Sequence, residues 1–200
     1  MKTGAIPMRA AWTRIWLVSW PFTTRRQTML EASPSQAHYL IAKLQPKYLV
    51  EIITQNIDDL HERAGSHGVI HLHGSIRFLV PKGFRNPKYR QPWYKDVKMG
   101  ECCPCTRSQL RPDIVLFGET VYEYQHSRRW LCEADIVIII GTSLLVEPAF
   151  SLLQNINPGA SVYYIDPDPG LSSRLPFPGE QIVDGANRGV VHLLQKICHD

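Results

Sequence analysis

The run from Ala134 to Ser143, "ADIVIIIGTS", holds five consecutive β-branched residues and ends in Gly-Thr-Ser. β-Branched residues favour strands, and a strand with this pattern is apolar on both faces. A strand that is buried on both faces belongs in the middle of a parallel sheet covered by helices. The run therefore predicts an α/β protein built around a parallel sheet.

Segments with strand and helix patterns alternate along the rest of the chain. After Ser33, an expected N-cap, apolar residues recur at helical spacing at Ala37, Leu40, Ile41 and Leu44. Further expected strands are 48–54, 69–73, 113–117 and 161–166, and further expected helices are 58–65, closed by Gly65, and 189–197. Strands that alternate with helices predict an open, Rossmann-like sheet.

Residues 76–112 lose this regularity, because five prolines and two glycines interrupt them. We interpret residues 76–111 as a small irregular insertion. The main Rossmann-like domain would then consist of residues 1–75 and 112–200.

Composition favours an intracellular protein that binds neither nucleic acid nor membranes. The 22 basic and 18 acidic residues give a net charge of +4 and are dispersed. The most basic segment, Lys82 to Lys98, is interpreted as a solvated loop rather than a nucleic-acid patch. No run reaches the roughly 18 apolar residues of a membrane span. Five cysteines, an odd number, argue against a disulfide framework and predict a cytoplasmic location; the oligomeric state is left open.

Small or polar residues follow four of the expected strands, at the edge where ligands bind in open α/β sheets. Glycine lets a backbone approach a ligand closely, amides and hydroxyls donate to phosphate or ribose, and a carboxylate accepts from ribose hydroxyls. This chemistry suits a dinucleotide. The residues are Thr54-Gln55-Asn56, His73-Gly74, Gly141-Thr142-Ser143 and Asp166.

The sequence resembles the sirtuins, the Sir2 family of NAD-dependent protein deacylases. Four blocks look like the signature blocks of that family, in its order and at suitable spacing. The resemblance covers Ser33 to Ile197 and implies an enzyme that transfers an acyl group from lysine to ADP-ribose and releases nicotinamide. The blocks are "TQNIDDLHERAG", "VIHLHGS", "LRPDIVLFGE" and "GTSLLVEPA".

The resemblance also implies residue roles. His73 would be the general base that takes a proton from a ribose hydroxyl, a task that imidazole can perform near neutral pH. The cofactor NAD would be bound by Gln55, Asn56, Ile57 and Asp58 around the nicotinamide ribose, and by Gly141, Thr142, Ser143, Asp166 and Asn187 on the adenosine side. A peptide carrying the acyl-lysine would be clamped by strand addition at Phe117, Gly118, Glu119 and Val146.

Several polar residues near these positions also have plainer interpretations. His71 alternates with His73 on the expected strand, so we interpret it as a structural residue on the other face. His61 and His67 are interpreted as a helix-surface and a loop residue, and Asp59 as solvated or capping. Without the resemblance, His73 itself would fit a hydrogen-bonded structural histidine.

A second resemblance concerns the acyl group. The segment from Leu17 to Met29 looks like the part of the bacterial-type class III sirtuins that carries Tyr-x-x-Arg. In that class the pair recognises the carboxylate of succinyl- or malonyl-lysine. The matching residues here are Phe22 and Arg25. Arg25 keeps a guanidinium that can bind a carboxylate bidentately, whereas Phe22 lacks the hydroxyl; the alternative is that Phe22 is core and Arg25 is surface.

The N-terminal residues depart from the family pattern. Sirtuins carry a glycine-rich loop that covers the pyrophosphate, and "MKTGAIPMRAA" looks like the two ends of that loop without its middle. The resemblance therefore implies that the first strand and most of the loop are missing. We expect slow turnover on this basis, and the alternative is a catalytically silent domain that binds NAD or ADP-ribose.

The expected metal site also departs from the family. The zinc ribbon of sirtuins uses two C-x-x-C pairs to make a closed tetrahedral site. Cys102 and Cys105 form one pair, with Cys103 between them, but the segment from Ser75 to Tyr89 holds neither cysteine nor histidine. Zinc binding is therefore left open, and the insertion resembles a degenerate zinc ribbon.

Overall fold

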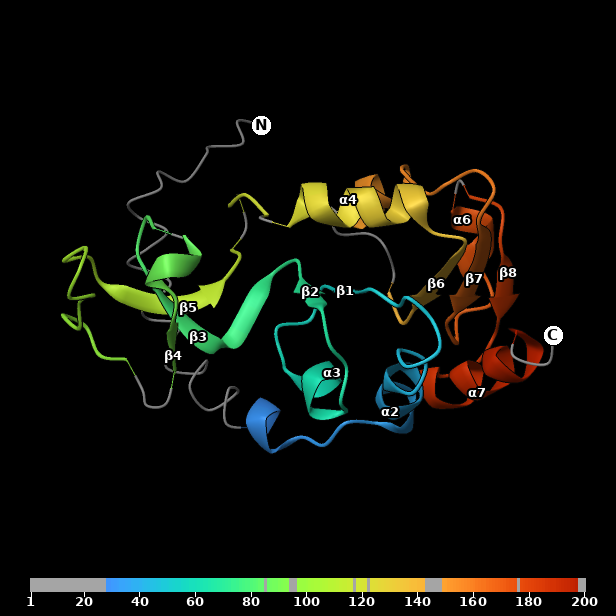
Figure 1. The fold of residues 1–200 in the computed structure, drawn as a ribbon, viewed down its shortest axis with the longest axis horizontal. Coiled ribbons are helices and arrows are strands. Elements are labelled where there is room, and N and C mark those ends of the chain that lie inside the picture. The colour runs from blue at the N-terminus through green and yellow to red at the C-terminus, as the bar shows by residue number, and fades with distance from the viewer. Residues whose placement is uncertain are drawn as a thin grey trace, which may run out of the picture. The chain divides into compact units, whose positions relative to one another are not determined.

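The computed structural model describes residues 28–84, 86–93, 97–116, 118–121, 123–142, 149–175 and 177–197 of the chain. These residues form two compact units. The larger holds residues 34–75 and those from 114 onward, and the smaller holds residues 28–33 and 76–113. The elements, labelled as in Figure 1, are α2 (Gln36–Ala42), β1 (Ile52–Thr54), α3 (Leu60–Arg63), β2 (Val69–His71), β3 (Gly74–Pro81), a 3-10 helix (Pro87–Tyr89), β4 (Gln91–Pro92), β5 (Leu110–Ile114), α4 (Tyr124–Glu133), β6 (Ile136–Ile140), α5 (Ala149–Leu153), β7 (Ser161–Ile165), α6 (Leu171–Arg174), β8 (Glu180–Ile182) and α7 (Ala186–Ile197).

The larger unit is built on parallel strands. β6, β7 and β8 pair in that order, and their register aligns Ile140 with Ile165 and Ile165 with Ile182. β1 and β2 form a second parallel pair, with Ile53 opposite Ile70. Parallel strands flanked by helices confirm the predicted α/β class.

One face of the larger unit is covered by α4 and α5. Val137 and Ile139 point to this face from β6 and pack in one buried cluster with Tyr164 of β7. The cluster also contains Ile70 and Leu72, from β2 and the turn after it. The two parallel sheets therefore share a hydrophobic core, although the described residues contain no hydrogen-bonded ladder between them.

The opposite face is covered by α2 and α7, which lie together in Figure 1. Ile165 of β7, Val190 and Leu193 of α7 and Ala37 of α2 form the second buried cluster, against which Ile138 packs. Because Ile138 faces this cluster and Val137 the other, β6 is covered on both faces, as the run of β-branched residues predicts. None of the described helices is long and apolar enough to cross a membrane.

Local boundaries differ from the sequence prediction at the first helix. α2 begins at Gln36 with Ser35, not Ser33, as its N-cap. His38, at the third helical position, accepts a hydrogen bond from Ser35 N at 3.2 Å and so completes a capping box. The predicted end of α3 is confirmed, because Gly65 follows the helix with a φ of +99°.

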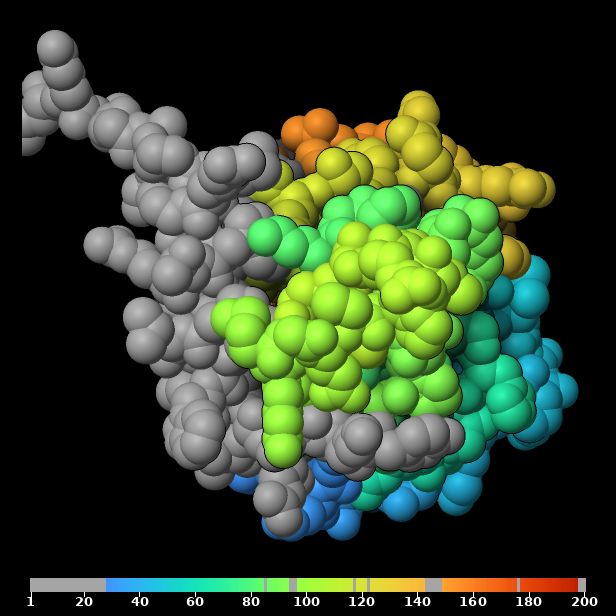
Figure 2. Space-filling view, turned by 90° about the vertical axis from the view of Figure 1, so that its left-hand side faces the viewer, coloured from blue at the N-terminus to red at the C-terminus, as the bar shows by residue number. Residues whose placement is uncertain are grey.

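The smaller unit is more regular than predicted. β3 runs for eight residues and lies between β4 and β5 in a three-stranded sheet. Ile76 and Val80 are buried, and the Arg90 guanidinium lies over the Phe78 ring while its Nε contacts Asp113 at 2.8 Å. Figure 2 shows surface residues of this unit, coloured green to yellow-green.

Candidate active site

The carboxyl ends of the strands in the larger unit gather the polar residues that the sequence singles out. Because Ile140, Ile165 and Ile182 are aligned in register, the residues that follow β6, β7 and β8 lie along one edge. Gln55 follows β1, and its Nε2 donates to Thr142 Oγ1, after β6, at 3.1 Å. Ligands of open α/β sheets bind at such an edge.

His73 is half-buried, and its ring is oriented by one hydrogen bond. Its Nδ1 lies 2.9 Å from the backbone carbonyl oxygen of Gln55. A carbonyl oxygen can only accept, so Nδ1 carries a hydrogen, and in the neutral ring the lone pair is then on Nε2. His73 is therefore held in the tautomer that a general base needs.

The segment after β1 is fixed by hydrogen bonds from backbone N–H groups to nearby side chains. Asn56 N donates to the buried Thr54 Oγ1 at 3.0 Å, and the Asn56 side chain is exposed. Asp58 Oδ1 accepts from Leu60 N at 3.1 Å and so stabilises the start of α3. Ile57 is half-buried between them. The exposed Asn56 side chain can therefore offer its amide to a ligand, whereas one oxygen of Asp58 is already hydrogen-bonded to Leu60 N.

Gly141 gives a ligand access to the backbone after β6. Its φ is +59°, its N donates to Ile165 O at 3.0 Å, and no described atom lies within 4 Å of the position that a Cβ would occupy. A side chain at this position would be strained and would fill this space. Thr142 follows Gly141, and its hydroxyl accepts the hydrogen bond from Gln55 Nε2.

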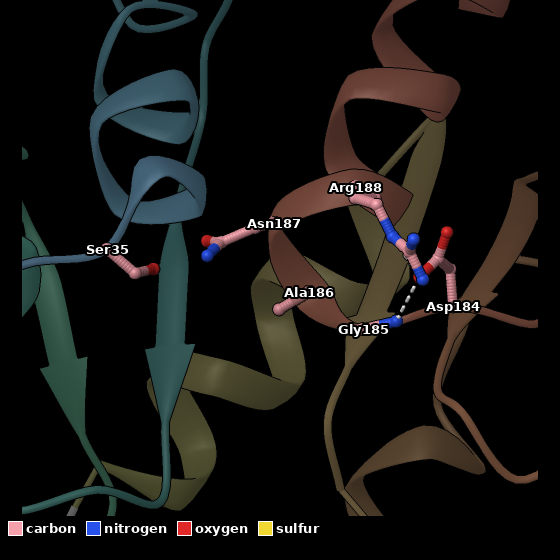
Figure 3. A pocket seen from close by; sticks show the side chains of 6 residues that line it. All are labelled: Ser35, Asp184, Gly185, Ala186, Asn187 and Arg188. Atoms are coloured by element: carbon pink, nitrogen blue, oxygen red, sulfur yellow. Dashed lines mark hydrogen bonds and ion pairs between the residues drawn. The ribbon is translucent and has the colours of Figure 1, made fainter.

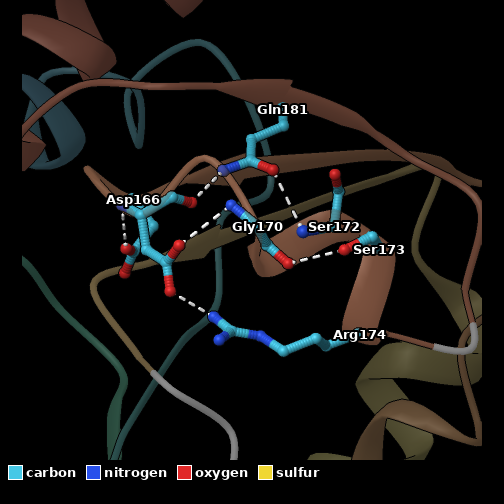
Figure 4. Close-up of polar contacts among 7 residues, drawn as sticks. Asp166, Gly170, Ser172, Ser173, Arg174 and Gln181 are labelled. Carbon is cyan, nitrogen blue, oxygen red and sulfur yellow. Dashed lines mark hydrogen bonds and ion pairs between the residues drawn. The ribbon is translucent and has the colours of Figure 1, made fainter.

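Asp166 follows β7 and leads into a tightly hydrogen-bonded turn (Figure 4). Asp166 Oδ1 accepts from Asp168 N at 2.8 Å, and Asp168 Oδ1 accepts from Gly170 N at 2.9 Å. Arg174 donates to Asp168 Oδ2, and Gln181 Nε2 donates to Asp168 O at 2.6 Å. The hydrogen bond from Gly170 and the Arg174 guanidinium lower the pKa of Asp168. The turn therefore holds the Asp166 carboxylate in one orientation.

A hollow of about 490 Å³ lies where α7 begins, after β8 (Figure 3). Asn187 lines it, but its Oδ1 accepts from Ala37 N at 3.0 Å and ties α7 to α2. Asp184 Oδ1 accepts from Gly185 N at 2.7 Å and pairs with Arg188. The sequence analysis missed Ser35 and Asp184, which also line the hollow; an acidic residue before a glycine at a helix start was the available signal.

Of the residues expected to contact a substrate peptide, Gly118 and Glu119 are described. Gly118 is exposed with a φ of +84°, and Glu119 Oε2 accepts from Leu116 N at 3.0 Å. These two residues form a turn after β5, which ends at Ile114, three residues before the predicted end of the strand at Phe117. The remaining expected site residues lie outside the described residues: Phe22, Arg25, Phe117, Ser143 and Val146.

The cysteine segment belongs to the smaller unit. Cys102 and Cys105, the expected pair, are exposed, whereas Cys103 is buried. Hydrogen bonds from the backbone and side chain of Thr106 lower the pKa of the Cys103 thiol. Within the described part of the chain no three Cys, His, Asp or Glu side chains are close enough to hold a metal ion. These residues therefore do not fit a closed zinc site.

Comparison with known proteins gives the family. The model of the Sir2 family matches residues 5–148. The chain belongs to the Sir2 family.

Sir2 proteins of known name and structure resemble it over most of its length. An NAD-dependent protein deacylase of Helicobacter pylori (strain J99 / ATCC 700824) is 42% identical over 176 residues, which are 88% of this chain and 72% of the relative. A Sir2 homologue mutant in complex with ADP-ribose superposes with a TM-score of 0.77 at 30% identity, covering 98% of this chain and 80% of that one. Sir2Tm bound to a propionylated peptide gives a TM-score of 0.67 at 27% identity, covering 86% and 75% of the two chains.

Proposed function

We propose that this Sir2 protein is an NAD-dependent protein-lysine deacylase. The observation that carries the proposal is the orientation of His73, whose Nδ1 is occupied by Gln55 O at the edge that also holds Gly141 and Asp166. Three similar proteins support it: the Helicobacter relative is named an NAD-dependent protein deacylase, one solved structure is a complex with ADP-ribose, and another is bound to a propionylated peptide. Residues 1–75 and 112–200 would be the cofactor-binding domain and residues 76–111 a separate small subdomain, a division supported by the boundaries of the two compact units after residues 75 and 113.

The residues at the strand ends fit NAD. The open space at Gly141 admits a phosphate or ribose, the exposed Asn56 amide can bind hydroxyls, and the Asp166 carboxylate can accept from a ribose hydroxyl. Asn187 and the hollow at the start of α7 would receive the adenosine end. When bound, NAD supplies the ADP-ribose that accepts the acyl group and the nicotinamide that leaves.

His73 would take the proton of the accepting ribose hydroxyl on Nε2, and the hydrogen bond from Nδ1 to Gln55 O would stabilise the charged ring that results. Gln55, held by Thr142, would keep that carbonyl in place. The overall transfer consumes one water molecule and releases the lysine amine.

The substrate would be an acyl-lysine in a peptide or protein. Gly118 and Glu119 form a turn that would border the peptide. Phe117 and Val146, the other expected contacts, lie outside the described residues. For the acyl group we propose acetyl and succinyl, the latter through Arg25 and its neighbour Phe22. The slow turnover expected from the N-terminal sequence concerns residues outside those described. A catalytically silent NAD-binding domain is the less favoured alternative, because the Helicobacter relative is named for its activity.

The test is NAD-dependent release of nicotinamide with acetyl-lysine and succinyl-lysine peptides. We expect release with both, and a loss of at least 100-fold in His73→Ala, because general bases contribute about 10²–10⁴-fold. His67→Ala is the matched control, since the His67 side chain is exposed. Arg25→Ala should reduce release from the succinyl peptide more than from the acetyl peptide.

Absence of release from the wild-type protein with either peptide, while NAD still binds in calorimetry, would favour the silent domain instead. Equal release by wild type and His73→Ala would remove His73 from the reaction.

A further inference from the structure

Two consecutive backbone carbonyls, those of Gln55 and Asn56, are each bound by a histidine. His73 Nδ1 lies 2.9 Å from Gln55 O, and His71 Nδ1 lies 3.0 Å from Asn56 O. The sequence analysis placed His71 on the opposite face of the strand from His73 and gave it no part in the site. Its ring nevertheless contacts the same loop that His73 contacts, the segment after β1.

The second ring nitrogen of His71 also meets an acceptor. His71 Nε2 lies 2.7 Å from Glu62 Oε1, and the His71 side chain is only 11% exposed. A backbone carbonyl can only accept, and so can an ionised carboxylate. Both contacts are hydrogen bonds only if both ring nitrogens carry hydrogen, which makes His71 an imidazolium paired with the Glu62 carboxylate.

The surroundings favour this charge state. Burial by itself would lower the pKa of His71, but the hydrogen bonds to Glu62 and to the Asn56 carbonyl, with the charges of Glu62 and Asp58, raise it. The pKa of Glu62 is lowered: burial would raise it, and the hydrogen bond to His71 outweighs that.

The neighbouring histidines stay neutral. Burial, the largest cause, lowers the pKa of His61 on α3 to about 4, and the rings of His38 and His61 lie 4.6 Å apart. Burial also lowers the pKa of His38 on α2. The titratable groups that act on His71 are thus Glu62 and His61 of α3 and Asp58 of the loop, while His38 of α2 packs on His61. Of these three histidines, His71 holds the positive charge.

We propose that His71 is a positioning residue: as an imidazolium held by Glu62, it fixes the Asn56 carbonyl and so holds the Asn56 side chain toward NAD. The proposal rests on the deacylase function proposed above. Deprotonation of His71 leaves one N–H, which the Glu62 carboxylate retains because it is a stronger acceptor than a backbone carbonyl. The Asn56 carbonyl then loses its donor, and the loop is freed. Affinity for NAD should therefore fall as the pH rises through the pKa of His71.

The charge state of His71 can be measured without an activity assay. Long-range ¹H–¹⁵N spectra of the histidine rings at pH 7.5 should show both nitrogens of His71 protonated, with the signal assigned by its loss in His71→Gln. In Glu62→Gln the same ring should be neutral, because the amide oxygen keeps the hydrogen bond but not the charge. A neutral His71 in the wild-type protein at this pH overturns the proposal.

The positioning role is tested by the KM for NAD between pH 6.5 and 9. In the wild type KM should rise with pH, and in Glu62→Gln the rise should begin at lower pH. At pH 7.5 the KM of Glu62→Gln should be about tenfold higher than that of the wild type, and kcat should change less. Glu62 is 43% exposed on its side chain, so this variant is expected to fold. His67→Gln is the control with an unchanged profile. An unchanged KM and pH profile in Glu62→Gln overturns the role.

Failure of the deacylase proposal can be distinguished from failure of the positioning proposal. If the wild type released no nicotinamide, calorimetric titration with NAD would still compare the affinities of wild type and Glu62→Gln across the same pH range. Weaker binding by Glu62→Gln supports the positioning role without turnover, and equal binding by the two proteins overturns it.

Discussion

Gln55 donates to Thr142 at 3.1 Å, although β1 and β6, the strands that precede these two residues, are not hydrogen-bonded to each other in the described structure. Strands in one sheet lie about 4.8 Å apart. A glutamine side chain is long enough to bridge a wider separation than that. This contact ties the β1–β2 pair to the β6–β8 sheet at the candidate site.

The first prediction concerns this contact. Thr142→Val keeps the shape of the side chain but removes the hydroxyl, so it should destabilise the protein by about 0.5–1.5 kcal/mol and weaken NAD binding. Denaturant unfolding and calorimetry measure the two effects. In a double-mutant cycle with Gln55→Leu the effects should not add; full additivity would show that the contact contributes nothing.

The second prediction concerns pH and stability. His61 has a folded pKa of about 4, below the unfolded value of about 6.5. Its contribution to the free energy of unfolding is therefore fully present above pH 6.5 and is lost as the pH falls toward 4. His71 has a raised folded pKa, so its contribution is present below about pH 6.5 and is lost as the pH rises through the folded value.

His61→Phe keeps a ring against His38 but cannot be protonated. Unfolding free energies measured from pH 4 to 6.5 should therefore rise less steeply with pH in this variant than in the wild type, by at most one bound proton. His67→Phe, at an exposed position, should follow the wild-type slope. Parallel curves for His61→Phe and wild type would contradict the buried neutral state of His61.

The third prediction concerns the packing of α7 on β7. A Cβ added at Gly189 would overlap Ile165 Cγ2. Alanine gains about 1 kcal/mol in helix propensity, but overpacking typically costs about 1–3 kcal/mol, so Gly189→Ala should be destabilising on balance. Gly159→Ala, where the nearest atom is Asn157 Oδ1 at 3.6 Å, should stay within about 0.5 kcal/mol of wild type. Thermal and denaturant unfolding of both variants decide this.

The fourth prediction concerns α4. Ser127 is fully buried, and its Oγ has no hydrogen-bond partner among the described residues. Ser127→Ala removes a hydroxyl that is desolvated without compensation, so it should stabilise the protein by about 1 kcal/mol. Ser151→Ala, which removes the acceptor of Tyr124 OH at 3.2 Å, should destabilise it instead. A loss of stability in Ser127→Ala would show that the hydroxyl is bonded.

The sequence predicted β6 well as a strand covered on both faces, because five β-branched residues leave few other structures for that run. In the described sheet, however, β7 and not β6 lies in the middle. The strand near Pro112 was placed too late. The expected strand was 113–117, whereas pairing with β3 places β5 at Leu110–Ile114 and so includes Pro112, a residue type disfavoured inside strands. Tertiary pairing overrode the local preference.

The candidate site was predicted in part. His73 and Gln55 could be named from a resemblance, and the structure brings them into contact. The contact of His71 with the same loop could not be predicted, because alternation of faces holds only within a strand. β2 ends at His71, so the two-residue period does not set the direction of His73. A contact with Glu62, nine residues away on α3, depends on how the loop folds back.

The turn after β7 has a consequence for how tightly a ligand can bind. Because Asp166 Oδ1 is held by Asp168 N, and Asp168 by Gly170 and Arg174, the carboxylate already has a fixed rotamer without a ligand. Ordering a side chain on binding costs about 0.5–1.5 kcal/mol in lost conformational entropy. At Asp166 that entropy is lost when the chain folds, so a ribose that binds there meets an acceptor already in place, and the affinity gained is not offset by immobilising it.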